Sequence, residues 1–341
     1  MDDIKTPALA SSVEAVVGST GFSGVVRVDS DGSTVLDAAF GLADRRHGVP
    51  MTTATRLGTA SGTKGLTALT VLSLVAEGAL GLDQPVREVL GADLPLIDDR
   101  VTIEDLLTHR SGIGDYYDEE VVLEVTDHVL TVPVHTLATT EDYLPVIDGH
   151  PQVFEPGERC VYNNSAFVVL AIVAGRVAGR PFEDLLVERV CRPAGMTSTS
   201  FLRGDDLPGD AATGYPWTDR DRTNVLHLPV VGSGDGGAYS TSADVAALWG
   251  SLFAGRILPA EVVEDAMRRR GGTVSEAGYG LGFELRGDGV VALTGSDAGV
   301  SFRSVHDRGT DVTWTVISNT SEGAWPVARI LGEHLGVAAQ A

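Results

Sequence analysis

Apolar residues recur at strand spacing near both ends of the chain and at helical spacing in its middle. After a helical stretch over about residues 8–17, the runs 21–30 and 32–43 are β-rich, and the "DSDG" between them is typical of a hairpin turn. The far end carries an amphipathic helical pattern over 323–336. Strand-like runs precede it at 278–287, 289–296, 299–307 and 310–321.

The middle of the chain is largely helical by the same criterion, with long connections rich in Gly, Pro and Asp. Strands at both ends with helices between them predict an α+β fold, with one antiparallel sheet built from both termini, flanking helices and an inserted, mostly helical region. We expect residues 1–60 and 230–341 to form the sheet region and 61–229 the helical region. The two would make one unit, with the functional site in the cleft between them.

Composition narrows the choice of partner. The chain has 341 residues, 43% of them hydrophobic, which is enough for a large core. Asp and Glu number 47 against 25 Lys and Arg, giving a formal net charge of −22. Such a charge repels phosphate backbones and anionic lipid head groups, so neither nucleic acid nor a membrane surface is expected as a partner.

The expected compartment is the cytoplasm. Residues 1–19 lack the basic and apolar regions of a secretory signal, and no run approaches the roughly 18 apolar residues of a membrane span. Only two cysteines occur, Cys160 and Cys191, so a disulfide framework is not expected.

No cofactor or metal is expected either. The eight histidines show no metal-ligand spacing, and the glycine-rich stretches match neither a phosphate-binding loop nor a dinucleotide fingerprint. The G-x-S-x-G pattern of the α/β-hydrolase elbow does not occur.

The stretch "SGTKGLTALTVL" places Ser61 and Lys64 at the start of an apolar helical pattern. An i, i+3 pair lies on one helix face, and the positive end of the helix favours an oxyanion beside a serine there. A lysine held beside the serine and partly desolvated can accept its proton. A lone S-x-x-K is more often a helix cap followed by a solvated lysine.

A second stretch strengthens the catalytic interpretation. "CVYNNSAFVVLAIVAG" places Tyr162 and Asn164 immediately before another apolar helix. A phenol beside an ammonium group can relay protons, and an Asn amide can both donate and accept hydrogen bonds. Taken alone, Tyr162 would more often be a packed aromatic residue.

Together these stretches resemble the serine β-lactamase-like hydrolases, which comprise class C β-lactamases, D-amino-acid peptidases and esterases of the same fold. That branch combines S-x-x-K with Y-x-N, and "YNN" fits the second element. The resemblance extends from about Gly21 to the end of the chain. Further landmarks follow in the expected order: "LTHRSGI" (107–113), "FEPGERCVYNNSAF" (154–167), "RPAGMTSTSF" (192–201), "GGAYSTSADVAALW" (236–249), "GYGLGF" (278–283) and "VISN" (316–319).

The resemblance implies an acyl-enzyme mechanism. Ser61 would be the nucleophile, Lys64 the proton acceptor, Tyr162 its partner base and relay, and Asn164 a substrate-positioning amide. The oxyanion hole would use the backbone N–H groups of Ser61 and Ser296.

The third family element, K-T-G or H-x-G, is altered here to Leu293, Thr294 and Gly295, which are expected beside the substrate together with Ser296. Leucine offers no counter-charge to the carboxylate through which β-lactams and D-peptides are recognised. The sequence therefore favours a cofactor-free hydrolase acting on a small, uncharged ester or amide, an ester above all. β-Lactamase, D-amino-acid peptidase or acyltransferase activity on the same fold stays open. An alternative of another class is a homologue that binds a ligand without turning it over.

Overall fold

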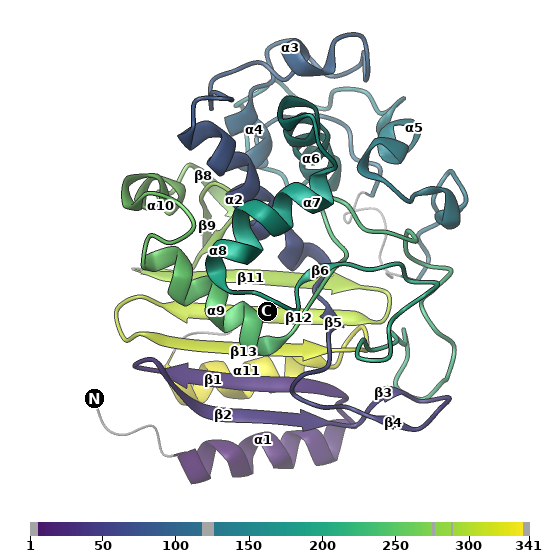
Figure 1. Cartoon of the computed structure of the whole chain (residues 1–341), viewed down its shortest axis with the longest axis vertical. Helices are drawn as coiled ribbons and strands as arrows, with labels where there is room; N and C mark the ends of the chain where they lie inside the picture. The colour runs from purple at the N-terminus through teal and green to yellow at the C-terminus, as the bar shows by residue number, and fades with distance from the viewer. Residues whose placement is uncertain (1–5, 118–125, 275–276, 288, 337–341) are drawn as a thin grey trace.

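The computed structural model describes residues 6–117, 126–274, 277–287 and 289–336. It has an antiparallel sheet in the lower half of Figure 1 and a group of helices in the upper half. The predicted α+β class is confirmed. The elements that border the site come from both halves.

The main sheet contains eight strands within the described residues, and both ends of the chain contribute to it. β1 and β13 pair with each other inside the sheet, with Gly24 opposite Ser318, so strands far apart in sequence are neighbours. The predicted sheet built from both termini is therefore confirmed. In sheet order the strands are β2 (Ser33–Phe40), β1 (Gly24–Ser30), β13 (Val312–Ser318), β12 (Val300–Asp307), β11 (Val290–Asp297), β10 (Glu284–Leu285), β9 (Ala277–Tyr279) and β8 (Gly271–Val274).

The predicted turn between the first two strands is present. Ser30 pairs with Ser33, and the two residues between them, Asp31 and Gly32, have φ of 49° and 72°. Positive φ at both central positions is the signature of a tight hairpin turn, and Asp-Gly is among its preferred sequences.

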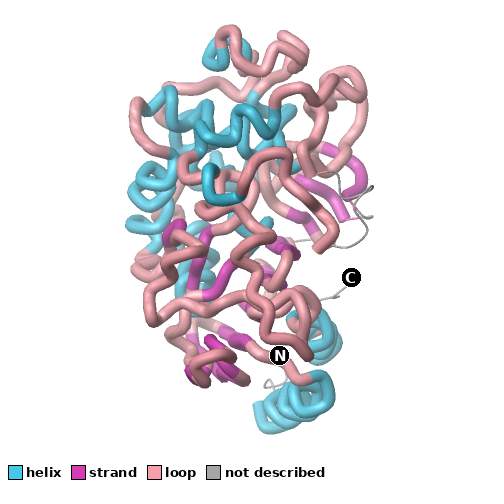
Figure 2. The backbone as a smooth tube through the Cα atoms, turned by 90° about the vertical axis from the view of Figure 1, so that its right-hand side faces the viewer, coloured by secondary structure: helices cyan, strands magenta, loops and turns pink. Residues whose placement is uncertain are grey.

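Alternation along the strands gives the sheet two apolar faces. Val26 and Val28 of β1 pack against α1 (Thr6–Thr20) and α11 (Ala324–Leu335), the two terminal helices, which lie side by side on one face in Figure 2. Val25, which directly precedes Val26, belongs to the larger core on the other face. A period of two residues accounts for this division.

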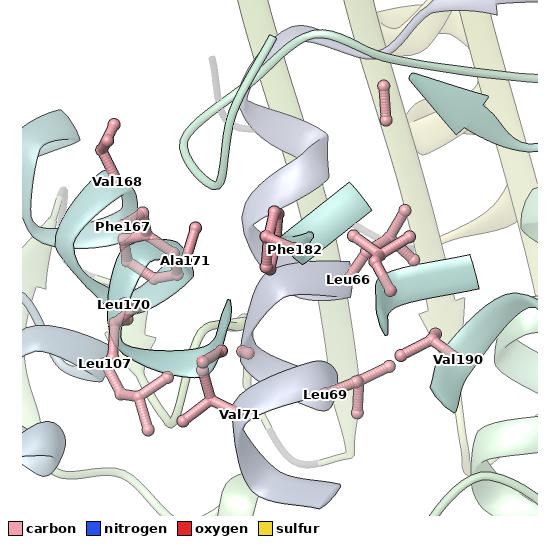
Figure 3. Close-up of a cluster of buried hydrophobic side chains, with 14 of the residues drawn as sticks. Leu66, Leu69, Val71, Leu107, Phe167, Val168, Leu170, Ala171, Phe182 and Val190 are labelled. Carbon is pink, nitrogen blue, oxygen red and sulfur yellow. The ribbon is translucent and has the colours of Figure 1, made fainter. Parts of the chain in front are cut away.

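The larger core fills the space between the sheet and the helical region. In Figure 3, Leu66 and Leu69 of α2 (Thr63–Ala76) lie on the side of Phe182 and Val190, and Val71 lies on the side of α6 (Asn164–Ala178), near Leu170. Burying these apolar side chains fixes α2 and α6 side by side, and both carry predicted site residues. The other helices of the described chain are α2 (Thr63–Ala76), α3 (Arg87–Leu90), α4 (Ile103–Leu107), α5 (Leu144–Ile147), α6 (Asn164–Ala178), α7 (Phe182–Leu186), α8 (Arg192–Ala194), α9 (Ser242–Phe253) and α10 (Ala260–Ala266), with 3-10 turns η1 (Ala60–Gly62), η2 (Val134–Thr136) and η3 (Thr140–Tyr143) and a π-helical turn η4 (Val187–Cys191).

Two small sheets were not predicted. β3 (Leu42–Asp44) pairs with β4 (Val49–Pro50), and β7 (Ala238–Ser240) lies between β5 (Leu57–Gly58) and β6 (Ser200–Phe201). Strands of two or three residues are too short to show alternation, which explains the omission. The second of these sheets joins the chain just before Ser61 to the stretch "GGAYS".

Among the described helices, none alone has both the length and the apolar character needed to cross a membrane. α6 and the segment 182–194 meet that criterion only as a pair, which is bent by 84°.

Candidate active site

Ser61 lies in the 3-10 turn η1, directly before α2, where the apolar pattern predicts a helix start. The preceding residue, Ala60, has φ of 44°, which residues with a Cβ rarely adopt. The N–H of Thr59 donates to the carbonyl of Ala238 at 2.9 Å, so β7 fixes the chain entering this turn. Ser61 is partly exposed, whereas Lys64, one turn further on, is 2% exposed.

The ammonium of Lys64 is held by three acceptors. Its Nζ lies 2.9 Å from Oγ of Ser61, 2.8 Å from Oδ1 of Asn164 and 2.7 Å from the carbonyl oxygen of Asp235. Three donors on one nitrogen match three acceptors, so the buried cation has all its hydrogen bonds satisfied. Its side chain contributes to the site and not to a solvated helix face.

Tyr162 lies just before the start of α6, and its side chain contacts the same serine. Its hydroxyl lies 2.8 Å from Oγ of Ser61, and its ring centroid is 4.8 Å from Nζ of Lys64. Ser61, Lys64, Tyr162 and Asn164 therefore form one connected polar group, although they lie up to 103 positions apart in sequence. A cation beside a phenol favours the phenolate form.

The beginning of α6 is fixed by two side chains. Asn163 caps the helix by accepting the N–H of Ala166 at 2.7 Å. Asp115 accepts the N–H groups of Asn164 and Ser165 at 2.7 and 2.9 Å. Burial raises the pKa of Asp115 to about 6, against the lowering effect of these bonds. A carboxylate at a helix N-terminus is favourably placed, and here it orients the residue that contacts Lys64.

Strand β11 runs along the opposite side of the serine. A Cβ on Gly295 would lie 2.2 Å from the carbonyl oxygen of Thr59 and 2.9 Å from the nitrogen of Ser61. This approach is open only to glycine. The next residue, Ser296, lines the same pocket as Ser61.

The other two residues of the altered element lie elsewhere. Leu293 is 5% exposed, belongs to the larger core and packs against α2 at Gly65. This placement differs from the expected contact with substrate, because strand alternation turns Leu293 toward α2. Thr294 points to the opposite face, and its buried Oγ1 has no hydrogen-bond partner within the described part of the chain.

Arg303, which sequence reasoning missed, is opposite Thr294 on β12 and is 4% exposed. Burial is the main cause that lowers its pKa to about 10, and Arg286 adds to the effect, so Arg303 stays charged at neutral pH. It does not belong to the described residues that line the pockets beside Ser61.

One pocket is lined by Ser61, and an adjoining pocket shares Tyr116, Asp235 and Asp297 with it. The described lining residues include no Lys or Arg, and burial lowers the pKa of each of the two lining histidines, His128 and His227. The Tyr116 hydroxyl donates to Asp235 at 2.5 Å. Among its described residues, the open part of the site therefore carries carboxylates and no counter-charge for an anion.

Sequence reasoning missed these aspartates. Asp235 lies within the glycine-rich "GSGDGGAYS", and Asp297 follows the third element directly. A lone acidic residue among glycines is a weak signal, since it becomes informative only once the fold brings it beside Lys64. Burial raises the pKa of Asp235, and the charge of Lys64 opposes that rise. In the described part of the chain, no group of three or more His, Cys, Asp or Glu residues could hold a metal ion.

Comparison with known proteins gives an independent assignment. The profile of the family described as Beta-lactamase matches residues 9–336. The chain is 30% identical over 301 residues to "Esterase EstB" of Burkholderia gladioli, covering 78% of this chain and 72% of that protein. It is 32% identical over 222 residues to the "D-aminopeptidase" of Brucella anthropi, but spans only 39% of that protein's length, and 63% of this chain is covered.

The fold is equally well matched among solved structures. The crystal structure of a penicillin binding protein from Bacillus halodurans superposes with a TM-score of 0.88 at 31% identity. The match covers 94% of this chain and 99% of that one.

Proposed function

Because the chain belongs to the beta-lactamase family of serine hydrolases, we propose that it hydrolyses a small ester through an acyl-enzyme formed on Ser61. The observation that carries this proposal is the connected group at the pocket, in which Ser61 Oγ lies within 2.9 Å of Lys64 and 2.8 Å of Tyr162. A nucleophile within hydrogen-bond reach of its base, with the base oriented by further groups, is the arrangement that covalent catalysis requires.

In the acylation step, Oγ of Ser61 attacks the ester carbonyl carbon while its proton passes to the Tyr162–Lys64 pair. The three acceptors around Lys64 favour its ammonium form, so we assign the first proton transfer to the phenolate of Tyr162. Lys64 then supplies the positive charge that stabilises the phenolate, and Asn164 keeps Lys64 in place.

The negative charge that develops on the carbonyl oxygen needs fixed donors. We assign these to the backbone N–H groups of Ser61 and Ser296, since Gly295 brings β11 against the serine turn. When the tetrahedral intermediate collapses, the ester C–O bond breaks and Tyr162 returns the proton to the leaving alkoxide. Water attacks the acyl-enzyme by the same route in reverse, releasing the acid and restoring Ser61.

The preference for an ester without a carboxylate rests on the charges of the cleft. Leu293 replaces the cation of the third element, and Asp297 adds a carboxylate beside Ser296. An anionic substrate would lose its hydration without gaining a counter-charge, which is costly. A neutral ester needs no such partner, and a cationic one would be attracted.

The alternatives predict different outcomes in one assay. A β-lactamase or D-peptidase would favour carboxylate-bearing substrates. An acyltransferase would divert the acyl group to an added alcohol or amine. A homologue that only binds would leave every ester intact.

The test compares three p-nitrophenyl esters of equal chain length that end in a methyl, an ammonium or a carboxylate group, with Ser61→Ala as the blank. We expect kcat/KM to be lowest for the carboxylate. Asp297→Asn, which removes a carboxylate from the pocket lining while keeping the size of the side chain, should raise the carboxylate-to-methyl ratio. Leu293→Met, which keeps the volume and adds no charge, should leave the ratio unchanged.

The ratio is measured on each variant separately, so a general loss of activity does not affect it. Faster turnover of the carboxylate ester or of nitrocefin by the wild-type enzyme would contradict the ester proposal. Ser61→Ala with wild-type activity would contradict the nucleophile.

A further inference from the structure

His109 lies just after α4, directly behind the phenol ring of Tyr162. It is fully buried and has φ of 56°. A positive φ is usual for the residue that ends a helix, where glycine or asparagine is the common choice. A histidine at such a position therefore calls for an explanation.

The residue holds the backbone on both sides of Tyr162. The N–H of Val161 donates to the carbonyl oxygen of His109 at 2.9 Å. The N–H of Asn163 donates to Nδ1 of the His109 ring at 3.1 Å. Tyr162 is the single residue between these two bonds, and Asn163 is the cap of α6.

The His109 ring also packs among three aromatic rings. Its centroid is 4.6 Å from that of Tyr162, 5.1 Å from Phe167 and 4.8 Å from Tyr279. Because Nδ1 accepts a hydrogen bond, the proton of the neutral ring is on Nε2, which is buried and has no polar partner within the described chain. Burial, and secondly the charge of Lys64, hold the pKa of His109 well below its usual range.

We propose that His109 is a positioning residue for catalysis: two hydrogen bonds and ring packing hold Tyr162 so that its hydroxyl stays on Ser61. The inference rests on the proposed function, because it assigns Tyr162 a proton-transfer role. His109 itself transfers no proton in the reaction, because it contacts the ring of Tyr162 and stays neutral beside Lys64.

Two substitutions separate its contributions. His109→Asn places an amide oxygen where Nδ1 accepts from Asn163 and tolerates a positive φ, but it loses the ring. His109→Phe keeps a ring and loses the acceptor. Activity is expressed per active site titrated with a fluorophosphonate, so poor folding of either variant reduces the number of sites and not the measured rate.

For His109→Phe we expect kcat per titrated site to fall about 10- to 100-fold, the cost of a small misplacement of a reacting group, with KM little changed. The acid limb of the kcat/KM profile should move to higher pH, because a phenol displaced from the ammonium of Lys64 keeps its proton longer. His109→Asn should retain more of the rate than His109→Phe.

The matched control is His306→Asn. His306 is also a buried histidine, 4% exposed, with its Nδ1 2.8 Å from Oγ1 of Thr313 and its ring stacked on Phe253. It pairs with Val291, at the end of β11 away from Ser296. This variant should lower the melting temperature without changing kcat per site or the pH profile.

Unchanged kcat per site and an unchanged acid limb in His109→Phe would overturn the proposal and leave His109 a packing residue. Equal losses in both His109 variants would overturn the role given to Nδ1. Failure of the proposed function is seen separately, because Ser61→Ala would then match the wild-type enzyme whatever His109 does.

Discussion

The two walls of the cleft differ in kind. The wall made by α2 and the start of α6 presents Lys64, Tyr162 and Asn164. Lys64 is hydrogen-bonded to Ser61 and to Asn164, and Tyr162 to Ser61. The wall made by β11 presents backbone at Gly295 and buries Leu293 in the core. The first wall contains the groups that move protons, whereas the second contributes shape and backbone dipoles. The charge of the second wall can therefore change while the chemistry of the first persists.

The walls also depend on different residue types. On the first wall, the requirement is for particular functional groups at fixed distances. The second wall requires a residue without a side chain at position 295, because a Cβ on Gly295 would lie 2.2 Å from the carbonyl oxygen of Thr59. Substitutions on the two walls should consequently fail for different reasons, and two experiments test this contrast.

The largest effect is expected on the first wall, where Lys64→Met and Tyr162→Phe should each reduce kcat by about 100- to 10,000-fold, the range of general acid–base catalysis. The double variant should be no worse than the poorer single one, because groups that act as a unit are not additive. Steady-state kinetics on p-nitrophenyl acetate measures both.

Tyr162→Phe keeps the ring that packs on His109, so its stability serves as an internal control. If Tyr162→Phe kept kcat within about threefold of wild type, the tyrosine would be a packing residue. Independent, multiplying losses would show that Lys64 and Tyr162 act separately.

A smaller loss is expected on the second wall. In Gly295→Ala, the added methyl group should push β11 away from the serine turn and separate the N–H groups of Ser61 and Ser296. Loss of one oxyanion donor costs about 100- to 1000-fold in kcat, so the rate should fall within that range while the Lys64–Tyr162 pair stays intact.

Gly250→Ala is the matched control, since a Cβ there meets nothing within 4 Å. It should leave kcat unchanged. A Gly295→Ala enzyme with normal kcat would show that the oxyanion is stabilised elsewhere, and the contrast between the two walls would fail.

The parts of this arrangement that could be predicted from the sequence are those encoded by short local patterns or by motifs. The turn sequence "DSDG" and the long alternating runs predicted the sheet. The apolar pattern that begins at Ser61 and Lys64 predicted the start of α2. The meeting of Tyr162 with Ser61 across 101 positions followed only from the family resemblance, because nothing in either stretch encodes the distance between them.

What could not be predicted depends on tertiary packing. Leu293 was expected against substrate, but its place in the core follows from the approach of α2 at Gly65. Asp235 carries no motif, and its carbonyl becomes an acceptor for Lys64 only because a glycine-rich loop folds back onto α2. The short strands β5, β6 and β7 were missed for want of alternation.

Every role assigned above depends on Ser61 being the nucleophile of the site. The most direct measurement treats the wild-type protein with a fluorophosphonate and locates the adduct by intact mass and peptide mapping. We predict one adduct per chain on Ser61, none in Ser61→Ala, and slower labelling in Lys64→Met. An adduct on Ser296, the other serine among the described residues of the pocket, or labelling of Ser61→Ala at the wild-type rate would contradict this role of Ser61.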